Sequence, residues 1–539
     1  MTPLNLLRGH LESFMRNWLP GFFATGASFL LLWWAQPPNH FPEAAYFFLI
    51  PCLLWLYSQP DKGKILLTVF VCAFLYSVGL VGWIRHVSLS GMLLASIVIG
   101  GYYLPWFYLT SRWIRAASHG SLAIRLSCLL GLSSLWVLVE WMRSSFTLGF
   151  PWCPLSVSQW ERPAILQLVP FAGGWIVSFF LVFFNLSLAS YLHHLLVRRH
   201  SAKSKGAFTS MCPEFYLCMF FFLGMLSPIL FKNTYSNGSD KVSIRVGICQ
   251  PYLLEKWSPE NIKKNKQTLI EQTKLLGSLS PDLIVWPEAS TPYAVNLDRQ
   301  WVEDLSKEVS APILAGAIVK EPEASYNCVV KINPDTGLDS KRYSKQILVP
   351  FGEFIPFPFN YIPGIKRLVG PVGEFSSGKS LKSFTFQNDK NETLSIIPII
   401  CYEDIFPDLF KDLPSSSHTM LFVTTNDAWF GEEGCAEQHA AHSVMRALEC
   451  GMPVLRCGNA GWSGWITPKG SIRTVLLDED KSVYFRGASV LNLEVDPLVS
   501  TFYKKNGNYF VALCFVFVIL SSFTLRKYFK ILHNNKTSF

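Results

Sequence analysis

The stretch "SIIPIICYED" (residues 395–404) ends an apolar run at Cys401, and Tyr402 and two acids follow directly. A short isoleucine-rich run that ends in polar residues is typical of a buried β-strand. By itself, a cysteine in such a place is more often a small buried hydrophobe than a nucleophile. Pro398 removes one ladder hydrogen bond, so we expect either an edge strand at that point or a bulge before Cys401.

Similar β-rich runs recur between about residues 240 and 500, where charged residues are also frequent. Helix-like polar stretches separate several of them, as at 258–279 and 436–451. This alternation predicts an α/β domain over 240–500, large enough to bury its own core. The other runs are "KVSIRVGICQ", "PDLIVWPE", "APILAGAIV", "NCVVKINP", "TMLFVTTND" and "MPVLRCGN".

The first 235 residues have a different character. Half of the 539 residues are hydrophobic, 16% are charged and 42 are Phe, which is too apolar for an ordinary soluble protein. A bilayer core needs about 20 apolar residues per helix. We expect a membrane domain of about seven transmembrane helices over 1–235, the first two runs being short enough to form a re-entrant pair instead. The candidate spans are 21–36, 44–58, 64–84, 91–111, 122–142, 166–194 and 215–232.

A last apolar run, 509–526, precedes a basic cluster and predicts a C-terminal transmembrane helix. The alternative is a hydrophobic helix that lies on the α/β domain. Basic residues occupy every second loop of the N-terminal region, and the positive-inside rule places those loops in the cytoplasm. The 240–500 domain then faces the outer side, tethered at both ends. We expect the first apolar run to be retained as a helix, because no small-residue cleavage motif follows it.

Charge and cysteine content exclude other classes. The net charge is +9, but the basic residues lie in short clusters between apolar runs, which does not indicate nucleic-acid binding. The 13 cysteines form no CxxC pair and no Cys/His zinc pattern. We therefore expect neither a disulfide framework nor a metal site, and no cofactor.

Three stretches of the α/β domain carry residues suited to acyl transfer. "DLIVWPEAS" ends a run at Glu288, "RYSKQILVPFGEFIPF" carries Lys345 and Glu353, and the third ends at Cys401. A carboxylate can take the proton of a thiol, and an ammonium can stabilise the oxyanion that the thiolate forms at an acyl carbonyl. Taken singly, Glu288 reads as a solvated acid and Lys345 as part of a surface charge run.

The combination resembles the Glu–Lys–Cys signature of the nitrilase superfamily, on "WPE" (286–288), Lys345 with "LVPFGEFIP" (348–356), and "ICYE" (400–403). With its apolar helices, the whole chain resembles the apolipoprotein N-acyltransferases, bacterial inner-membrane enzymes. "GFPW" (149–152), "TNDAWF" (425–430), "MRALE" (445–449) and "RCGNAGWSGWITPKG" (456–470) extend the resemblance. Ala460 and the two Trp of the last stretch depart from an expected loop richer in Asn and Thr.

The resemblance implies a periplasmic nitrilase-like αββα sandwich on a multi-pass helical bundle. It implies that Cys401 takes the sn-1 acyl chain of a phospholipid as a thioester and passes it to the α-amino group of an apolipoprotein's diacylglyceryl-cysteine. Glu288 would be the general base and Lys345 the oxyanion partner. The remaining implied roles are Glu353 as a supporting carboxylate, Tyr402 and Glu403 in the nucleophile's turn, and Trp257 and Trp429 at the substrate entrance.

Two alternatives stay open. A membrane-anchored nitrilase-type amidohydrolase would use the same triad with water as acceptor. A transporter or scaffold would need ionisable residues in its spans, and Glu140 and Arg125, near run ends, are the main candidates.

We expect a monomer whose partners are phospholipid, diacylated apolipoprotein and membrane. The apolar stretch 349–370 is either a lid over the site or an ordinary proline-stiffened loop.

Overall fold

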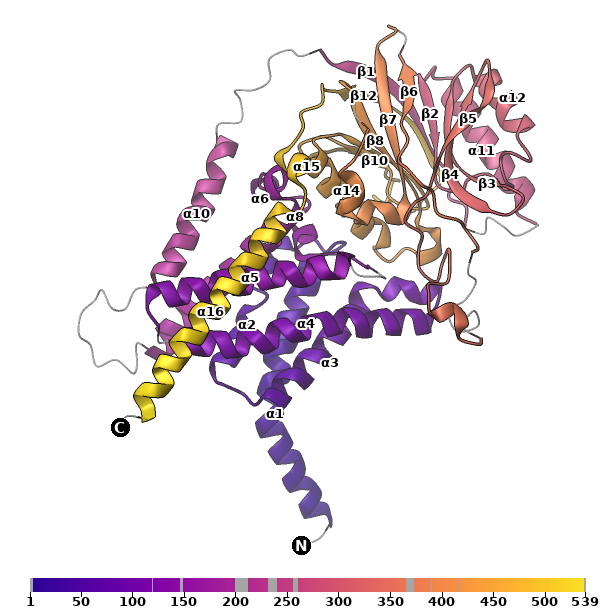
Figure 1. The fold of residues 1–539 in the computed structure, drawn as a ribbon. Coiled ribbons are helices and arrows are strands. Elements are labelled where there is room, and N and C mark those ends of the chain that lie inside the picture. Colours follow the sequence, from indigo (N-terminus) through magenta and orange to yellow (C-terminus); the bar gives the residue numbers. More distant parts are fainter. Residues whose placement is uncertain are drawn as a thin grey trace.

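The computed structural model describes residues 3–118, 120–145, 149–198, 212–230, 240–254, 260–364, 373–388, 390–414 and 416–537. Helices form the N-terminal half, and two β-sheets with their covering helices form most of the rest (Figure 1). The chain ends in a long helix that runs back along the helical half (Figure 1). The apolar parts of the chain therefore form the long helices, and the more charged part between them forms the sheets.

Within the described residues, six helices are long and apolar enough to cross a membrane. They are α1 (Pro3–Ala35), α3 (Lys62–Leu80), α4 (Leu89–Ala117), α5 (Leu122–Ser145), α8 (Gly174–His193) and α16 (Tyr509–Thr537). A further apolar helix is α10 (Pro213–Leu230). These helices fit a multi-pass membrane region, while the count of seven spans before residue 235 stays a prediction.

Short helices connect the long ones. The apolar run 44–58 is divided between η1 (Pro42–Tyr46) and α2 (Ile50–Tyr57), each with a proline in its first turn. Proline is well placed there and poorly placed inside a helix, so the run does not form one span. The other short elements here are η2 (Gly82–His86), η3 (Leu155–Gln159), α6 (Pro163–Leu166), α7 (Val169–Ala172) and the π-helical turn η4 (His194–Arg198).

The ionisable side chains Arg125 and Glu140 bind other residues of the helical bundle. Arg125 forms an ion pair of 2.9 Å with Glu214, whose side chain is fully buried. Glu140 accepts hydrogen bonds from the indole of Trp136 at 2.9 Å and from the amide of Leu155 at 2.8 Å. Both candidates for a transport role thus have partners that fasten helices and loops together.

Two six-stranded mixed sheets form the C-terminal half. The order of the first sheet is β12-β1-β2-β3-β4-β5, and that of the second is β11-β10-β9-β8-β7-β6. Strands β1, β2 and β3 run parallel, as do β7, β8 and β9. The strands are β1 (Val242–Gln250), β2 (Leu283–Trp286), β3 (Ile313–Lys320), β4 (Ser325–Asn333), β5 (Gly337–Ser344), β6 (Phe384–Gln387), β7 (Thr393–Ile400), β8 (Thr419–Asn426), β9 (Val454–Asn459), β10 (Gly464–Ile466), β11 (Ile472–Val475) and β12 (Gly487–Val495).

The sheets pack face to face, with side chains such as Val285 and Phe422 buried between them. Helices α11 (Ile262–Gly277) and α12 (Gln300–Val309) cover the outer face of the first sheet, and α14 (Cys435–Cys450) covers that of the second. This αββα arrangement confirms the predicted fold class. The remaining short elements are η7 (Phe359–Tyr361), η8 (Cys401–Ile405), η9 (Pro407–Phe410), η10 (Asp427–Phe430) and α15 (Phe502–Asn506).

Pro398 lies where β7 has a single neighbour. The antiparallel partner β6 pairs only with residues 393–396, whereas the parallel partner β8 pairs with residues 395–400. The missing amide of Pro398 therefore costs no hydrogen bond on the β6 side. The first expected alternative, an edge at that point, is correct.

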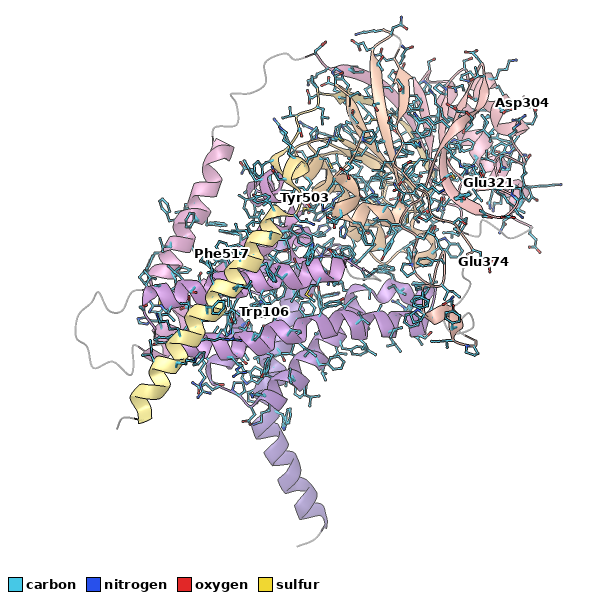
Figure 2. All side chains as sticks on the ribbon, in the orientation of Figure 1. Trp106, Asp304, Glu321, Glu374, Tyr503 and Phe517 are labelled. Carbon is cyan, nitrogen blue, oxygen red and sulfur yellow. The ribbon has the colours of Figure 1, made fainter. Side chains whose placement is uncertain are left out.

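Helix α14 joins the sandwich to the bundle. The Gln438 side-chain oxygen accepts from the indoles of Trp83 at 3.0 Å and Trp152 at 2.7 Å, and its nitrogen donates to the Leu80 carbonyl. One turn further on, His442 accepts from the amide of Cys153 at 3.3 Å. Figure 2 shows side chains filling the space between the two halves, with Tyr503 where α15 meets the bundle and Asp304 at the far end of the sandwich.

Candidate active site

The three predicted catalytic residues follow the carboxyl ends of three strands. Glu288 lies two residues after β2, Lys345 directly after β5, and Cys401 directly after β7. Glu288 is 6% exposed and Lys345 1% exposed, while Cys401 is partly accessible. Two strands belong to the first sheet and one to the second, so packing of the sheets is what brings the residues together.

Lys345 lies between two carboxylates. Its Nζ is 3.3 Å from Glu288 Oε1 and 2.9 Å from Glu353 Oε2. Burial alone would lower the pKa of Lys345, but the two carboxylates outweigh burial and raise it. The ammonium is therefore permanently charged at neutral pH, which suits a group that stabilises a developing oxyanion.

Asn327 on β4 connects the two carboxylates. Its Nδ2 donates to Glu288 Oε1 at 2.7 Å and to Glu353 Oε1 at 3.1 Å. Asn327 was not among the predicted site residues. An amide inside the apolar run "NCVVKINP" was the available signal, because a buried amide needs polar partners.

Cys401 begins η8 with a φ of +50°, in the left-handed region that residues with a Cβ seldom adopt. Burial first, and then the charge of Glu288, raise the pKa of the thiol, while Lys345 acts in the opposite direction. The resting group is thus a thiol, and it needs a base at the moment of attack. The Thr425 hydroxyl lies 3.6 Å from Sγ.

Glu403 stabilises the turn that carries Cys401. Its carboxylate accepts from the amides of Ile400 at 2.7 Å and Gln346 at 2.6 Å, and from the Tyr343 hydroxyl at 2.8 Å. Burial raises the pKa of Glu403 to about 7, although these donors oppose the shift. The partners of Glu403 lie on both sheets, so this fully buried side chain ties the nucleophile's turn to the lysine's strand end.

Tyr402 reaches the bundle. Its hydroxyl donates to the carbonyl of Gly149 at 2.9 Å, and its ring stacks near Phe150 with centroids 6.4 Å apart. The "GFPW" stretch therefore contacts the residue next to the nucleophile. This contact links the helical half directly to the site.

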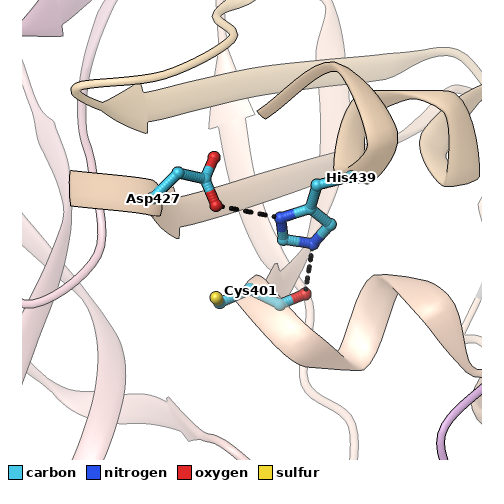
Figure 3. Close-up of side chains that lie close together, drawn as sticks. All are labelled: Cys401, Asp427 and His439. Carbon is cyan, nitrogen blue, oxygen red and sulfur yellow. Dashed lines mark hydrogen bonds and ion pairs between the residues drawn. The ribbon is translucent and has the colours of Figure 1, made fainter. Parts of the chain in front are cut away.

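A second cluster lies beside Cys401 and was not predicted as functional (Figure 3). Asp427 Oδ1 is 3.2 Å from His439 Nδ1, and His439 Nε2 is 3.1 Å from the backbone oxygen of Cys401. Asp427 lies in the quoted "TNDAWF" stretch, whereas His439 is hidden in the apolar pattern of α14. The thiol, carboxylate and imidazole have the side-chain types of a metal site.

Hydrogen bonding explains this cluster better than a metal ion. The Thr425 hydroxyl is 3.6 Å from Cys401 Sγ, 3.0 Å from Asp427 Oδ1 and 3.5 Å from His439 Nδ1. The Thr425 hydroxyl therefore contacts all three side chains and links them by polar contacts. The group is a ring of polar contacts around the nucleophile.

The turn after β9 leaves room for Asp427. A Cβ on Gly461 would lie 2.7 Å from Asp427 Oδ2, so only glycine allows this close approach. Ala460, which departs from the expected pattern, is buried with a φ of +53°. Asn459 fastens the turn through hydrogen bonds to Leu253 and Asn426. Ala460 is thus packed inside a hydrogen-bonded turn.

The two predicted entrance residues differ in what the structure says of them. Trp429 lies in η10 and is 49% exposed, which leaves its ring accessible to a ligand. Trp257 lies outside the described residues. In the described part of the 349–370 stretch, Phe357 and Tyr361 are 78% and 74% exposed, so apolar rings of this loop face outward.

Two family models match the chain. Residues 28–187 match the apolipoprotein N-acyltransferase N-terminal domain, and residues 245–500 match the carbon-nitrogen hydrolase domain. The second match covers the two-sheet sandwich and contains Glu288, Lys345 and Cys401. The first covers most of the helical half.

Curated relatives named apolipoprotein N-acyltransferase match both halves. The Pseudomonas syringae pv. tomato protein is 28% identical over 404 residues, covering 73% of this chain and 74% of the relative. The Geobacter metallireducens protein is 26% identical over 451 residues, covering 81% and 80%. Among solved structures, an amidase from a Nesterenkonia species has 14% identity and a TM-score of 0.35, covering 52% of this chain and 98% of the amidase.

Proposed function

Because the chain belongs to the apolipoprotein N-acyltransferases, with that family's N-terminal domain ahead of a carbon-nitrogen hydrolase domain, we propose a specific route for its lipoprotein N-acylation. The chain moves the sn-1 acyl group of a phospholipid onto Cys401 and then onto an apolipoprotein. The acceptor is the α-amino group of the diacylglyceryl-modified N-terminal cysteine. A buried lysine held between two carboxylates, beside a thiol at a strand end, is the observation that supports this route.

In the first half-reaction, Glu288 takes the proton of the Cys401 thiol as sulfur attacks the sn-1 ester carbonyl. The negative charge that develops on the ester oxygen is stabilised by the Lys345 ammonium. The C–O bond then breaks, and Glu288 returns the proton to the departing glycerol oxygen. The products are a lysophospholipid and an S-acyl group on Cys401.

In the second half-reaction, Glu288 takes a proton from the acceptor's amino group as nitrogen attacks the thioester. Lys345 again faces the oxyanion, and as the C–S bond breaks Glu288 gives its proton to the departing sulfur, which restores the thiol of Cys401. Asn327 and Glu353 keep Glu288 and Lys345 in place through both steps. The amide product is more stable than the thioester, which gives the transfer its direction.

We place the sandwich on the periplasmic side of a bacterial inner membrane. The α14 contacts are made by η2 and the 149–153 loop, next to the first residue of α4 and the last of α5. Helix α4 has 29 residues and is therefore roughly 43 Å long, and its far end carries Arg112 and Arg115. Basic residues at the end of α4 away from the sandwich support this orientation.

The test is a trapping experiment with purified protein in detergent. A phospholipid with a labelled sn-1 chain is supplied without acceptor, and the protein is analysed by mass spectrometry. We expect one hydroxylamine-labile acyl group on Cys401, absent from Cys401→Ser and present in the matched variant Cys450→Ala, which changes another buried cysteine. Label on another residue, or no label, would contradict the proposal.

Adding acceptor separates transfer from hydrolysis. A diacylated lipopeptide with a free amino terminus should discharge the label into an amide. Release of free fatty acid alone would assign the amidohydrolase activity instead. Glu288→Gln should slow acylation by about 10² to 10⁴-fold, as expected for loss of a general base.

A further inference from the structure

His439 contacts the main chain of the nucleophile and not its sulfur. Its Nε2 lies 3.1 Å from the carbonyl oxygen of Cys401, and its Nδ1 lies 3.2 Å from Asp427 Oδ1. His439 and Asp427 are each 1% exposed. Figure 3 shows the imidazole between the carboxylate and the backbone oxygen, with the Cys401 sulfur directed away from it.

The two neighbours of the ring determine its hydrogen-bonding role. A carbonyl oxygen and a carboxylate oxygen only accept, so both ring nitrogens of His439 must donate, as they do in an imidazolium. Burial alone would raise the pKa of Asp427, but the charge and hydrogen bond of His439, together with Arg456 and the Thr425 hydroxyl, outweigh burial and lower it, which keeps that carboxylate ionised. The charged imidazole thus polarises the Cys401 carbonyl through a charge-assisted hydrogen bond.

The same peptide group bears the amide N–H of Tyr402. In a planar trans peptide the N–H points opposite to the carbonyl, and this peptide is not among the cis bonds of the chain. Because the oxygen is directed at His439, the Tyr402 N–H points away from the imidazole, and Figure 3 shows the Cys401 sulfur likewise directed away from the ring. Tyr402 is in the first turn of η8, where amides have no acceptor within the helix.

We propose that His439, oriented by Asp427, is a positioning residue that fixes the Cys401–Tyr402 peptide so that the Tyr402 N–H faces the oxyanion. This inference rests on the proposed acyl transfer. It gives the oxyanion a neutral donor in addition to the Lys345 ammonium. It also explains how Cys401 keeps its left-handed backbone, because the imidazole holds the carbonyl that would turn away if φ relaxed.

A matched pair of substitutions separates the two contacts of the ring. In His439→Asn the amide nitrogen replaces Nδ1 and reaches Asp427 but not the carbonyl. In His439→Gln the amide nitrogen replaces Nε2 and reaches the carbonyl of Cys401. His442→Leu is the control, because His442 lies on the same helix with the same 1% exposure but contacts the bundle.

Two rates are measured for each variant, with thermal unfolding as a check on folding. One is acylation of Cys401 by labelled phospholipid, which forms an oxyanion, and the other is alkylation of Cys401 by iodoacetamide, which forms none. We expect His439→Asn to lower acylation by about 100-fold, as for loss of one oxyanion donor, with alkylation within about threefold of wild type. His439→Gln should keep acylation within about tenfold. In His442→Leu the two rates should change by the same factor.

Three results would overturn the inference. His439→Asn acylating at the wild-type rate would show that the carbonyl contact does not matter. Acylation and alkylation falling together in His439→Asn would assign a general structural role. Failure of the wild-type protein to form any acyl-cysteine would refute the proposed function itself, and it is distinguished from the first two results because it needs no variant.

Discussion

Replacing Lys345 with Met should destabilise the protein and slow the acylation of Cys401, and the two effects have separable causes. Methionine keeps the length and volume of the side chain but removes the ammonium that lies 3.3 Å from Glu288 and 2.9 Å from Glu353. The two carboxylates would then repel each other across a site in which the lysine is 1% exposed. One of them must take up a proton or move.

The geometry sets the size of the effect. At these distances, and with an effective dielectric constant of about 20, each carboxylate attracts the ammonium by about 5 kcal/mol. Desolvation of the buried charges cancels part of that attraction, and truncating one partner of a buried ion pair costs about 3–5 kcal/mol. We expect Lys345→Met to lose stability in that range and to slow acylation by about 10² to 10³-fold.

A double variant distinguishes the two roles. Adding Glu353→Gln removes one stranded carboxylate, so roughly half of the lost stability should return, whereas acylation should stay at the level of Lys345→Met. Lys331→Met is the matched control. Lys331 is a half-buried lysine of β4 that donates to the Thr385 carbonyl, and its loss should cost about 1 kcal/mol.

Thermal unfolding in detergent and the rate of acyl-cysteine formation provide the two measurements. If Lys345→Met is as stable as wild type, the electrostatic reasoning is wrong. If the double variant regains acylation along with stability, Lys345 acts by holding the site together and not by stabilising the oxyanion.

Three other predictions concern Cys401, Tyr402 and Gln438. The rate of Cys401 alkylation by iodoacetamide should rise about tenfold per pH unit from pH 7 to pH 9 without a plateau, because burial and Glu288 raise the pKa of the thiol above its ordinary value. A plateau in the rate near pH 7 would contradict this. Tyr402→Phe should lower stability by about 0.5–1.5 kcal/mol in thermal unfolding, with acylation changed less than threefold, and a larger loss of acylation would give the hydroxyl a chemical role. Gln438→Leu should lower the free energy of unfolding by about 1–3 kcal/mol for each indole N–H that loses its acceptor, on Trp83 and Trp152. Gln438→Glu keeps an acceptor oxygen, so equal losses of stability in both variants would count against this assignment.

The residues that could be predicted from the sequence share a local signal. Glu288 and Cys401 each end a β-rich run, and the ends of such runs are where reactive side chains gather in α/β folds. Lys345 follows a charged stretch, and the resemblance of its motif is what identified it. The runs also predicted an α/β domain, because strand and helix patterns alternate along them, whereas the αββα sandwich was implied by the family resemblance. Pro398 could be assigned to two alternatives, and only the pairing of β6 decided between them.

The residues that escaped prediction depend on distant partners. Asn327 and Glu288 are 39 positions apart, and His439 and Cys401 are 38 apart, so no spacing in the sequence relates them. His439 also lies on a helix whose other residues are nearly all buried, and its neighbours give no sign of a special role. The run 44–58 was a single candidate span because hydropathy measures only how apolar a run is. It does not register that prolines begin two separate helices there.

The packing of α16 on α5 determines when the helical bundle can be completed during synthesis. Its Ser521 hydroxyl donates to the carbonyl of Ser127 on α5, across 394 residues of chain. At about 5–20 residues per second, translation takes about 20–80 s to cover that interval. Throughout that time α5 has an uncovered face, and the sandwich can fold before the bundle is complete. Helix α16 therefore closes the bundle only after the sandwich has been made, and a nascent chain that stops before α16 leaves that face of α5 open.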